Sequence, residues 1–374
     1  MKKITILALH LGYGGIEKCI SNLANSLVDD YEIEVVATYK LYDKPAFYFN
    51  DKICIKYLTE LKPNKKEIKD NLASLHFIKL CKELIKAKKI LKLKKSLMIN
   101  YIRNCDSDII ISTRDIHNLW LSKYGSSSAL RIGWEHNYHN NNKKYINEIV
   151  KSVYGLDYFV LVSKELRDFY SSKVKPKCVY IPNSIVSIPK KTSSLQNNNI
   201  ISVGRLSSEK GFIDLIDIFK LVHDRCPGVK LNIIGDGNEK QKIEKKISEY
   251  HLNEYIKLHG FQNSEYIASK LLDSSVYVMT SFTESFGLVI IEASSFGLPC
   301  VAFDSAKGVS EIIKDNWDGY LISNRDKEKM AKRIINLIND KNRRIIMGNN
   351  AYKKSKDYLA SNIKDKWIEI FEKK

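Results

Sequence analysis

The sequence predicts an α/β protein built from two doubly wound domains. Short apolar segments alternate with amphipathic segments along the whole chain, as strands and helices alternate around a parallel sheet. The 374 residues exceed what one ordinary hydrophobic core organises. A polar stretch over 190–199 separates two runs of this alternation. The hydrophobic content of 44% fits a globular protein, and no apolar run approaches the ~20 residues that span a bilayer.

The first run predicts a domain over residues 1–185. We expect its strands at 4–9, 33–37, 109–112, 131–134, 158–162 and 178–181, and helices at 16–27 and 164–170. The apolar start of the chain is short. His10 and a glycine loop follow it in place of a small-residue cleavage site, which predicts a buried first strand rather than a secretion signal.

A linker over 186–199 precedes the second run, which predicts a domain over 200–354. We expect its strands at 200–203, 230–234, 256–259, 276–279 and 300–303, and helices at 212–224, 239–250 and from 286 to Gly297. The segment 355–374 contains a last helix that we expect to cross back to the first domain. Two doubly wound domains facing each other would hold a ligand in the cleft at the carboxyl ends of their strands.

The seven cysteines are scattered along the chain and form no close pair. This pattern favours reduced thiols in a cytoplasmic protein over a disulfide framework or a zinc site. We therefore expect no metal cofactor from the cysteines.

Positive charge is concentrated in one segment of a chain whose formal net charge is +18. Residues 56–103 contain fourteen Lys and Arg and four acidic residues. Apolar side chains recur there at three- and four-residue steps, with lysines between them: Phe77, Leu80, Leu84, Ala87 and Leu91. A basic amphipathic helix is typical of proteins that bind an anionic membrane surface. Nucleic acid and plain solvation are the rival interpretations, but no RNA-binding aromatic signature is present, so we expect no nucleic-acid partner.

Two glutamates, Glu284 and Glu292, bracket seven residues that are otherwise apolar or small. We expect Glu284 in a loop and Glu292 about two turns inside an apolar helix, where an ionised carboxylate needs a partner. The amides of Phe286, Gly287 and Leu288 open this helix and can hold phosphate. A capping glutamate and a surface glutamate paired with lysine would be the alternative.

Other strand ends carry groups suited to an anionic ligand. Arg205 and Lys210 lie in a strand-to-helix loop and could clamp a diphosphate. Gly14 and Gly15 join the first strand to its helix and allow the backbone to approach an anion. His136 ends a strand of the first domain, on the rim where catalysis is expected.

Taken together these residues resemble the retaining glycosyltransferases of family 4, which have the GT-B fold of two Rossmann-like domains. The resemblance extends over nearly the whole chain and rests on the ordered set Gly14 and Gly15, His136, Arg205 with Lys210, and Glu284 with Glu292. It implies that Arg205 and Lys210 bind the donor diphosphate, that Glu284 contacts the donor sugar and that Glu292 binds the ribose. It also places Gly260 and Phe261 beside the nucleobase.

The resemblance implies an enzyme that transfers a hexose or N-acetylhexosamine from a nucleotide sugar. We expect the donor to be linked to UDP and the reaction to need no metal. The expected acceptor is a saccharide or a polyprenyl-diphosphate-linked saccharide in capsule, O-antigen or other surface-polysaccharide synthesis. Such an enzyme would be cytoplasmic and peripheral on the inner face of the cell membrane. A sugar-nucleotide epimerase with the same fold and a non-catalytic basic adaptor remain alternatives.

Some positions depart from the family pattern or suggest other chemistry. Ser285 stands where family members often have glycine, which could alter the sugar pocket. Asp106 and Asp108 resemble a metal-binding aspartate pair, but they directly precede an apolar strand, which favours a strand-edge loop. His139 lies in an Asn-rich stretch, which predicts an exposed loop residue.

Overall fold

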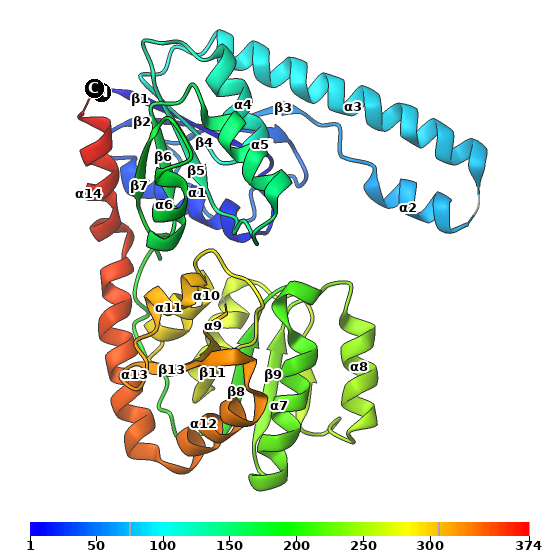
Figure 1. Ribbon diagram of the computed structural model, residues 1–374, viewed down its shortest axis with the longest axis vertical. Helices are drawn as coiled ribbons and strands as arrows, with labels where there is room; N and C mark the ends of the chain where they lie inside the picture. Colours follow the sequence, from blue (N-terminus) through cyan, green and yellow to red (C-terminus); the bar gives the residue numbers. More distant parts are fainter. Residues whose placement is uncertain (75, 306, 374) are drawn as a thin grey trace. The chain divides into compact units, whose positions relative to one another are not determined.

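The computed structural model describes residues 1–74, 76–305 and 307–373. It divides into two compact units: the first contains Met1–Leu161, Arg167–Ile181 and Lys364–Lys374, and the second contains Val162–Leu166 and Pro182–Ile363. Each unit has a parallel sheet with helices packed on it, so the expected α/β fold with two doubly wound domains is confirmed (Figure 1). The expected linker, 186–199, lies within the second unit.

The first unit is built on a seven-stranded parallel sheet in the order β3-β2-β1-β4-β5-β6-β7. Its strands are β1 (Lys3–Ala8), β2 (Glu32–Tyr39), β3 (Cys54–Thr59), β4 (Ile109–Ser112), β5 (Leu130–Glu135), β6 (Tyr158–Leu161) and β7 (Lys177–Tyr180). Its helices are α1 (Gly15–Leu27), α2 (Lys65–Ala73), α3 (Phe77–Arg103), α4 (Asp115–Tyr124), α5 (Lys143–Val153) and α6 (Lys164–Ser171), which runs across the division between the units. The central strands are apolar and almost fully buried, as a sheet covered on both faces requires.

The second unit is built on a six-stranded parallel sheet in the order β10-β9-β8-β11-β12-β13. Its strands are β8 (Asn199–Val203), β9 (Lys230–Ile234), β10 (Ile256–Leu258), β11 (Val276–Met279), β12 (Cys300–Phe303) and β13 (Gly319–Ile322). Its helices are α7 (Phe212–Arg225), α8 (Lys240–Glu249), α9 (Ser264–Leu272), α10 (Leu288–Ser295), α11 (Lys307–Ile312), α12 (Lys327–Asn339) and α13 (Lys341–Ser355). The edge strands β3 and β13 were not expected: β3 is mixed in polarity and only partly buried, and β13 has only four residues.

The last helix, α14 (Ala360–Phe371), runs across the division between the units. From Lys364 onward it belongs to the first unit, where Trp367 is buried edge-on against Trp134 with ring centroids 5.0 Å apart. Phe371 packs against Tyr31 in the same way at 5.5 Å. Large aromatic side chains therefore fix this end of the chain to the first unit.

Each sheet has one point where the order of its strands reverses. In the first unit that point lies between β1 and β4, and in the second unit between β8 and β11. Loops that leave two parallel strands in opposite directions open a crevice at their carboxyl ends, where doubly wound proteins bind ligands. The loops after β1 and β4, and those after β8 and β11, are therefore where side chains of functional interest should meet.

The loops after β8 and β9 approach each other so closely that only glycine fits. Gly235 has φ +145°, and a Cβ built on it would lie 1.8 Å from the carbonyl oxygen of Gly204. The amide of Gly204 donates to Ile234 O at 2.9 Å, and the amide of Gly235 donates to Gly260 O at 2.8 Å. This contact fixes the backbone directly before Arg205.

We expect Gly235→Ala to lower the free energy of unfolding by more than about 1 kcal/mol, because the new methyl group meets backbone and the backbone angle is unfavourable for alanine. Thermal unfolding checks this. Gly228→Ala is the matched control, since a Cβ there meets nothing within 4 Å. Equal melting temperatures for the two variants would contradict the close approach.

Candidate functional site

The reversal point of the second sheet brings together two residues that are 74 positions apart in the chain. Lys210, in the loop after β8, forms an ion pair with Glu284, in the loop after β11. Ser281 Oγ donates to Glu284 Oε1 at 3.0 Å, and Thr280 Oγ1 donates to the Lys210 carbonyl at 3.2 Å. Both charged side chains are mostly buried, so screening by water is weak and the pair fixes the loops to each other.

Arg205 differs from Lys210 in having no such partner. Its side chain is exposed and forms no ion pair with any residue that the structure describes. Its acidic neighbour Glu209 instead accepts a hydrogen bond from Ser207 Oγ at 2.6 Å. Arg205 is therefore a cation available to an incoming anion beside a lysine that is already positioned.

Helix α10 begins two residues later than the sequence predicted, at Leu288. Gly287 precedes it with φ +100°, a conformation that favours glycine, and Phe286 is buried. Glu292 consequently lies little more than one turn inside the helix, not two, and is half-buried. The negative charges of Glu284 and Glu292 both help to raise the pKa of Tyr277, although burial of this phenol is the larger cause. The two glutamates therefore lie close enough to one buried side chain to act on it together.

Phe261 is half-exposed in the loop after β10, beside Gly260 with φ +67°. Because the Gly260 carbonyl accepts from Gly235, this loop continues the row of strand ends that starts at Gly204. The structure thus places Phe261 on the same edge of the sheet as Arg205.

Sequence reasoning missed Arg325, which holds the Glu284 loop in place. Its guanidinium donates to Ser281 O at 3.0 Å and Thr280 O at 2.9 Å, and pairs with Asp214 at 2.7 Å. The aromatic ring of Phe282 lies 3.6 Å from the guanidinium carbon. The signal available in the sequence was an arginine shortly after a strand, which is too common to single out.

The reversal point of the first sheet carries a second charged group that the sequence did not reveal. Arg114, after β4, pairs with Glu17 of α1 at 2.8 Å, and Glu17 is buried. A Cβ on Gly14 would lie 2.1 Å from Glu17 Oε2, so this carboxylate lies directly under the glycine loop. Gly14 and Gly15 therefore begin α1 with a carboxylate already at its positive end.

His10 lies beside Glu17 in this cluster, and its imidazole ring is neutral. The amide of Gly12 donates to His10 Nδ1 at 3.2 Å, and Nδ1 lies 3.6 Å from Glu17. Burial lowers the pKa of His10 and outweighs the opposing effect of Glu17. Since Nδ1 accepts a hydrogen bond, the proton of the neutral ring sits on Nε2, and His10 can donate from that atom.

His136 directly follows β5 and is buried against Trp134, with ring centroids 4.3 Å apart. Burial, assisted by the charge of Arg114, lowers the pKa of His136 to about 3. The ring is therefore neutral at physiological pH and a weak base. Its preceding neighbour Glu135 is also buried, and burial raises the pKa of that carboxyl to about 7 although the amide of Asn137 donates to it at 2.7 Å.

Two expectations about nearby polar residues have different outcomes. The prediction that His139 is exposed is wrong. His139 is buried, because its ring stacks on Phe169 with centroids 3.8 Å apart. Asp106 and Asp108 lie before β4, where both contact Lys3: its ammonium pairs with Asp106 at 2.7 Å and its amide donates to Asp108 at 2.8 Å. They fasten the amino ends of β1 and β4, the strand-edge role that was expected.

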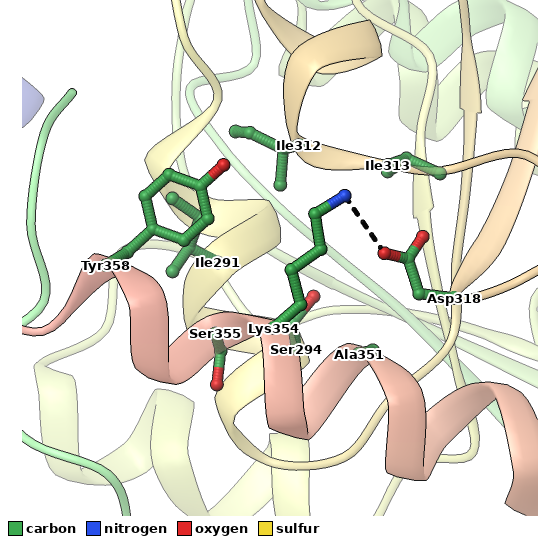
Figure 2. Close-up of a pocket in the computed structure, with 9 residues that line it drawn as sticks. All are labelled: Ile291, Ser294, Ile312, Ile313, Asp318, Ala351, Lys354, Ser355 and Tyr358. Atoms are coloured by element: carbon green, nitrogen blue, oxygen red, sulfur yellow. Dashed lines mark ion pairs between the residues drawn. The ribbon is translucent and has the colours of Figure 1, made fainter.

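A pocket behind α10 contains none of the predicted site residues. Its nine lining residues come mainly from α10, the end of α11 and α13, as Figure 2 shows. Lys354 pairs there with Asp318 at 3.1 Å, but burial still raises the pKa of Asp318. The pair joins α13 to the loop before β13. Within the described residues no three His, Cys, Asp or Glu side chains gather as metal ligands, and no helix is long and apolar enough to cross a membrane.

Within the second unit, the sequence matches a known protein family. Residues 186–354 match the family described as "Glycosyl transferases group 1". The matched region contains Arg205, Lys210, Glu284 and Glu292. The match to this family therefore covers a little less than half of the chain.

Relatives and solved structures extend the likeness to the full chain. The amylovoran biosynthesis glycosyltransferase AmsD of Erwinia amylovora is 27% identical, over 99% of this chain and 99% of its own. The Campylobacter jejuni GalNAc-alpha-(1->4)-GalNAc-alpha-(1->3)-diNAcBac-PP-undecaprenol alpha-1,4-N-acetyl-D-galactosaminyltransferase is 26% identical, over 99% and 98%. Crystalline S. aureus TarM, in complex with fondaparinux, alpha-GlcNAc-glycerol and UDP, superposes with a TM-score of 0.80 over 100% of both chains at 19% identity. The fold is that of the GT-B glycosyltransferases.

We expect Glu135→Gln to flatten the pH dependence of stability. A carboxyl with its pKa raised from about 4.5 to about 7 binds a proton in the folded state that the unfolded state releases. The unfolding free energy should therefore fall between pH 4.5 and 7, by at most about 3 kcal/mol, and Gln removes this loss while keeping an acceptor for the Asn137 amide. Thermal unfolding at pH 5 and pH 8 measures it, with the exposed Glu60→Gln as control. An unchanged slope in Glu135→Gln would contradict the assignment.

Proposed function

We propose that this chain is a retaining glycosyltransferase of the family 4 type that acts in bacterial surface-polysaccharide synthesis. Its donor is a nucleotide-activated hexose or N-acetylhexosamine, linked to UDP. Its acceptor is a saccharide or a polyprenyl-diphosphate-linked saccharide. The names of the Erwinia and Campylobacter relatives and the UDP bound to TarM support this class of substrates.

The single observation that carries the proposal is the arrangement of charges at the β8/β11 reversal point. Lys210 is oriented by Glu284, Arg205 is exposed beside it, and α10 begins at Leu288 with its free amides. One positioned cation, one exposed cation and a helix start together match a diphosphate, which carries two adjacent anionic groups. Glu292, inside α10, then has the place of a carboxylate that binds the ribose hydroxyls.

The chemistry follows from these charges. Breaking the bond between the anomeric carbon and the diphosphate leaves negative charge on the leaving oxygen, and Arg205, Lys210 and the amides of Phe286, Gly287 and Leu288 stabilise it. Glu284 contacts the donor sugar. We propose that the acceptor attacks from the face that the diphosphate leaves, which retains the anomeric configuration, and that the leaving phosphate takes the acceptor proton. No metal is assigned a part.

His136 fits a positioning role better than that of a base. With a pKa of about 3 it is a weak proton acceptor, whereas a neutral imidazole hydrogen-bonds to a sugar hydroxyl or a phosphate oxygen. We propose that the enzyme works from the inner face of the cell membrane, where lipid-linked acceptors are exposed to the cytoplasm.

A donor screen tests the function. The full chain is incubated with several nucleotide sugars in EDTA, with and without acceptor, and the released nucleotide is measured. We expect release from one UDP-sugar that rises strongly with acceptor. Interconversion of the UDP-sugar without acceptor would favour the epimerase, no affinity for any nucleotide sugar would favour the adaptor, and loss in EDTA restored by manganese would contradict metal independence.

Arg205→Ala and Lys210→Ala should each reduce turnover by at least about a hundredfold, the usual effect of losing a group that stabilises developing charge. Lys245→Ala is the matched control, because Lys245 is exposed on α8 and pairs only weakly with Glu249 at 3.8 Å. The rates are compared at saturating donor, with folding checked by circular dichroism. Folded variants with near-normal rates would exclude these residues from the diphosphate site.

A further inference from the structure

Helix α3 has its buried side chains in its middle and near its C-terminal end. Its 27 residues span roughly 40 Å, and the buried side chains it contributes are Ile90, Met98 and Ile102. Near its C-terminal end, Tyr101 hydrogen-bonds Glu34 of β2. In Figure 1 the N-terminal half of α3 projects beyond the sheet of the first unit, with α2 beside its far end.

The projecting half exposes large apolar side chains to water. The exposed fractions are 67% for Phe77, 78% for Ile78, 45% for Leu84, 57% for Ile85 and 60% for Leu91. Single exposed apolar residues are ordinary, but a contiguous set of this size marks a contact surface.

These five residues lie on one side of the helix, here called the outer face. Phe77, Leu84 and Leu91 follow each other at steps of seven residues, and Ile78 and Ile85 form the adjacent row. The face differs from the stripe that the sequence predicted. Leu80 and Ala87 are partly covered, and Ile78 and Ile85 stand exposed in their place.

The opposite side of α3 faces the segment that leads into α2. Asn64, just before α2, donates to the carbonyl of Glu83 at 2.8 Å and to its carboxylate at 2.6 Å. Glu83 is the one acidic residue of α3, and Lys86 lies 3.9 Å from it. The single carboxylate of α3 therefore already has partners on the inner side of the helix, and the outer face has no acidic side chain.

Lysines continue the outer face toward the C-terminal end of α3. Lys88 and Lys95 extend the row of Phe77, Leu84 and Leu91, and Lys92 extends that of Ile78 and Ile85. All three lysines are exposed and form no ion pair with a residue in the described part of the chain. The outer face thus changes from apolar at the projecting tip to cationic nearer the sheet.

This distribution selects among the surfaces that could cover the face. A second copy of the chain would bring two helices with nine basic residues and one acidic residue each against one another, and like charges would repel. Nucleic acid would attract the lysines but leave five apolar side chains unused. A bilayer with anionic headgroups accepts apolar side chains in its acyl region and lysines at its surface.

We propose that the tip of α3 inserts Phe77, Ile78, Leu84, Ile85 and Leu91 into an anionic bilayer while Lys88, Lys92 and Lys95 bind its headgroups. This insertion deepens the proposed function. It rests on that function in one respect: membrane contact would give the enzyme access to a lipid-linked acceptor. The insertion itself is independent of catalysis.

Vesicle binding by the full chain tests the insertion. We expect binding to vesicles of phosphatidylglycerol and phosphatidylcholine, and at least a tenfold weaker affinity when Phe77, Ile78, Ile85 and Leu91 are all changed to Gln. The matched control changes Tyr48, Tyr154, Val186 and Ile346 to Gln, because these side chains are similarly exposed but lie elsewhere. Absent binding by the unaltered protein, or equal affinity of both fourfold variants, would overturn the proposal.

Native cysteines report the depth of insertion. Cys81 lies on the outer face between Phe77 and Leu84, whereas Cys54 is exposed on β3. An environment-sensitive fluorophore on Cys81, in a Cys54→Ser variant, should shift to the blue on vesicles and be quenched by brominated lipid. The same fluorophore on Cys54, in a Cys81→Ser variant, should not. Equal responses at the two positions would contradict insertion.

Two further measurements separate the remaining outcomes. Sedimentation velocity of the unaltered protein without lipid should give a monomer, and a dimer that the fourfold Gln change dissociates would assign the outer face to a second copy. Nucleotide release with a short soluble acceptor should be the same in the fourfold Gln variant and the unaltered protein. Vesicle binding without any release would overturn the proposed function and leave the insertion standing, whereas release without vesicle binding would do the reverse.

Discussion

The reversal of strand order in each parallel sheet is the constraint on which the candidate site depends. All pairings in a sheet run in one direction, so every strand delivers its following loop to the same edge. At β8 and β11 the two loops diverge and leave room between them, and Lys210 and Glu284 meet there. The equivalent point at β1 and β4 brings Glu17 to Arg114. In both units the connection between strands, rather than nearness in sequence, places opposite charges together.

Charges at the second reversal point are held in place before any substrate arrives. Glu284 orients Lys210, Arg325 fastens the loop that carries Glu284, and the close contact of Gly235 with Gly204 sets the backbone ahead of Arg205. A site whose donors are fixed in advance avoids reorganisation while charge develops, which is the main source of electrostatic catalysis. Arg205, exposed among these fixed groups, keeps the freedom to close on a ligand.

In the first unit, burial is the main cause of the shifted pKa values of Glu135 and His136. His136 and Glu135 are adjacent, both buried, and burial shifts each toward its neutral form. At physiological pH this strand end therefore offers an uncharged imidazole and a carboxyl that is partly protonated, which suit hydrogen bonds to hydroxyl groups. The second unit instead presents the cations Arg205 and Lys210 at its reversal point. The two units thus differ in the chemistry that they present.

The sequence by itself determined the fold class and most of the candidate residues. Alternating apolar segments identified eleven of the strands, because burial on both faces requires continuous apolar runs, and strand-to-helix loops identified Arg205, Lys210 and Glu284. The edge strands β3 and β13, the partners Glu17 and Arg114, the bracing Arg325 and the burial of His139 were decided only by tertiary structure. So was the exposed side of α3, where helical periodicity located the apolar residues but not what covers them. Local sequence fixes which groups a segment carries, whereas contacts between distant segments decide which groups are buried, paired or left facing water.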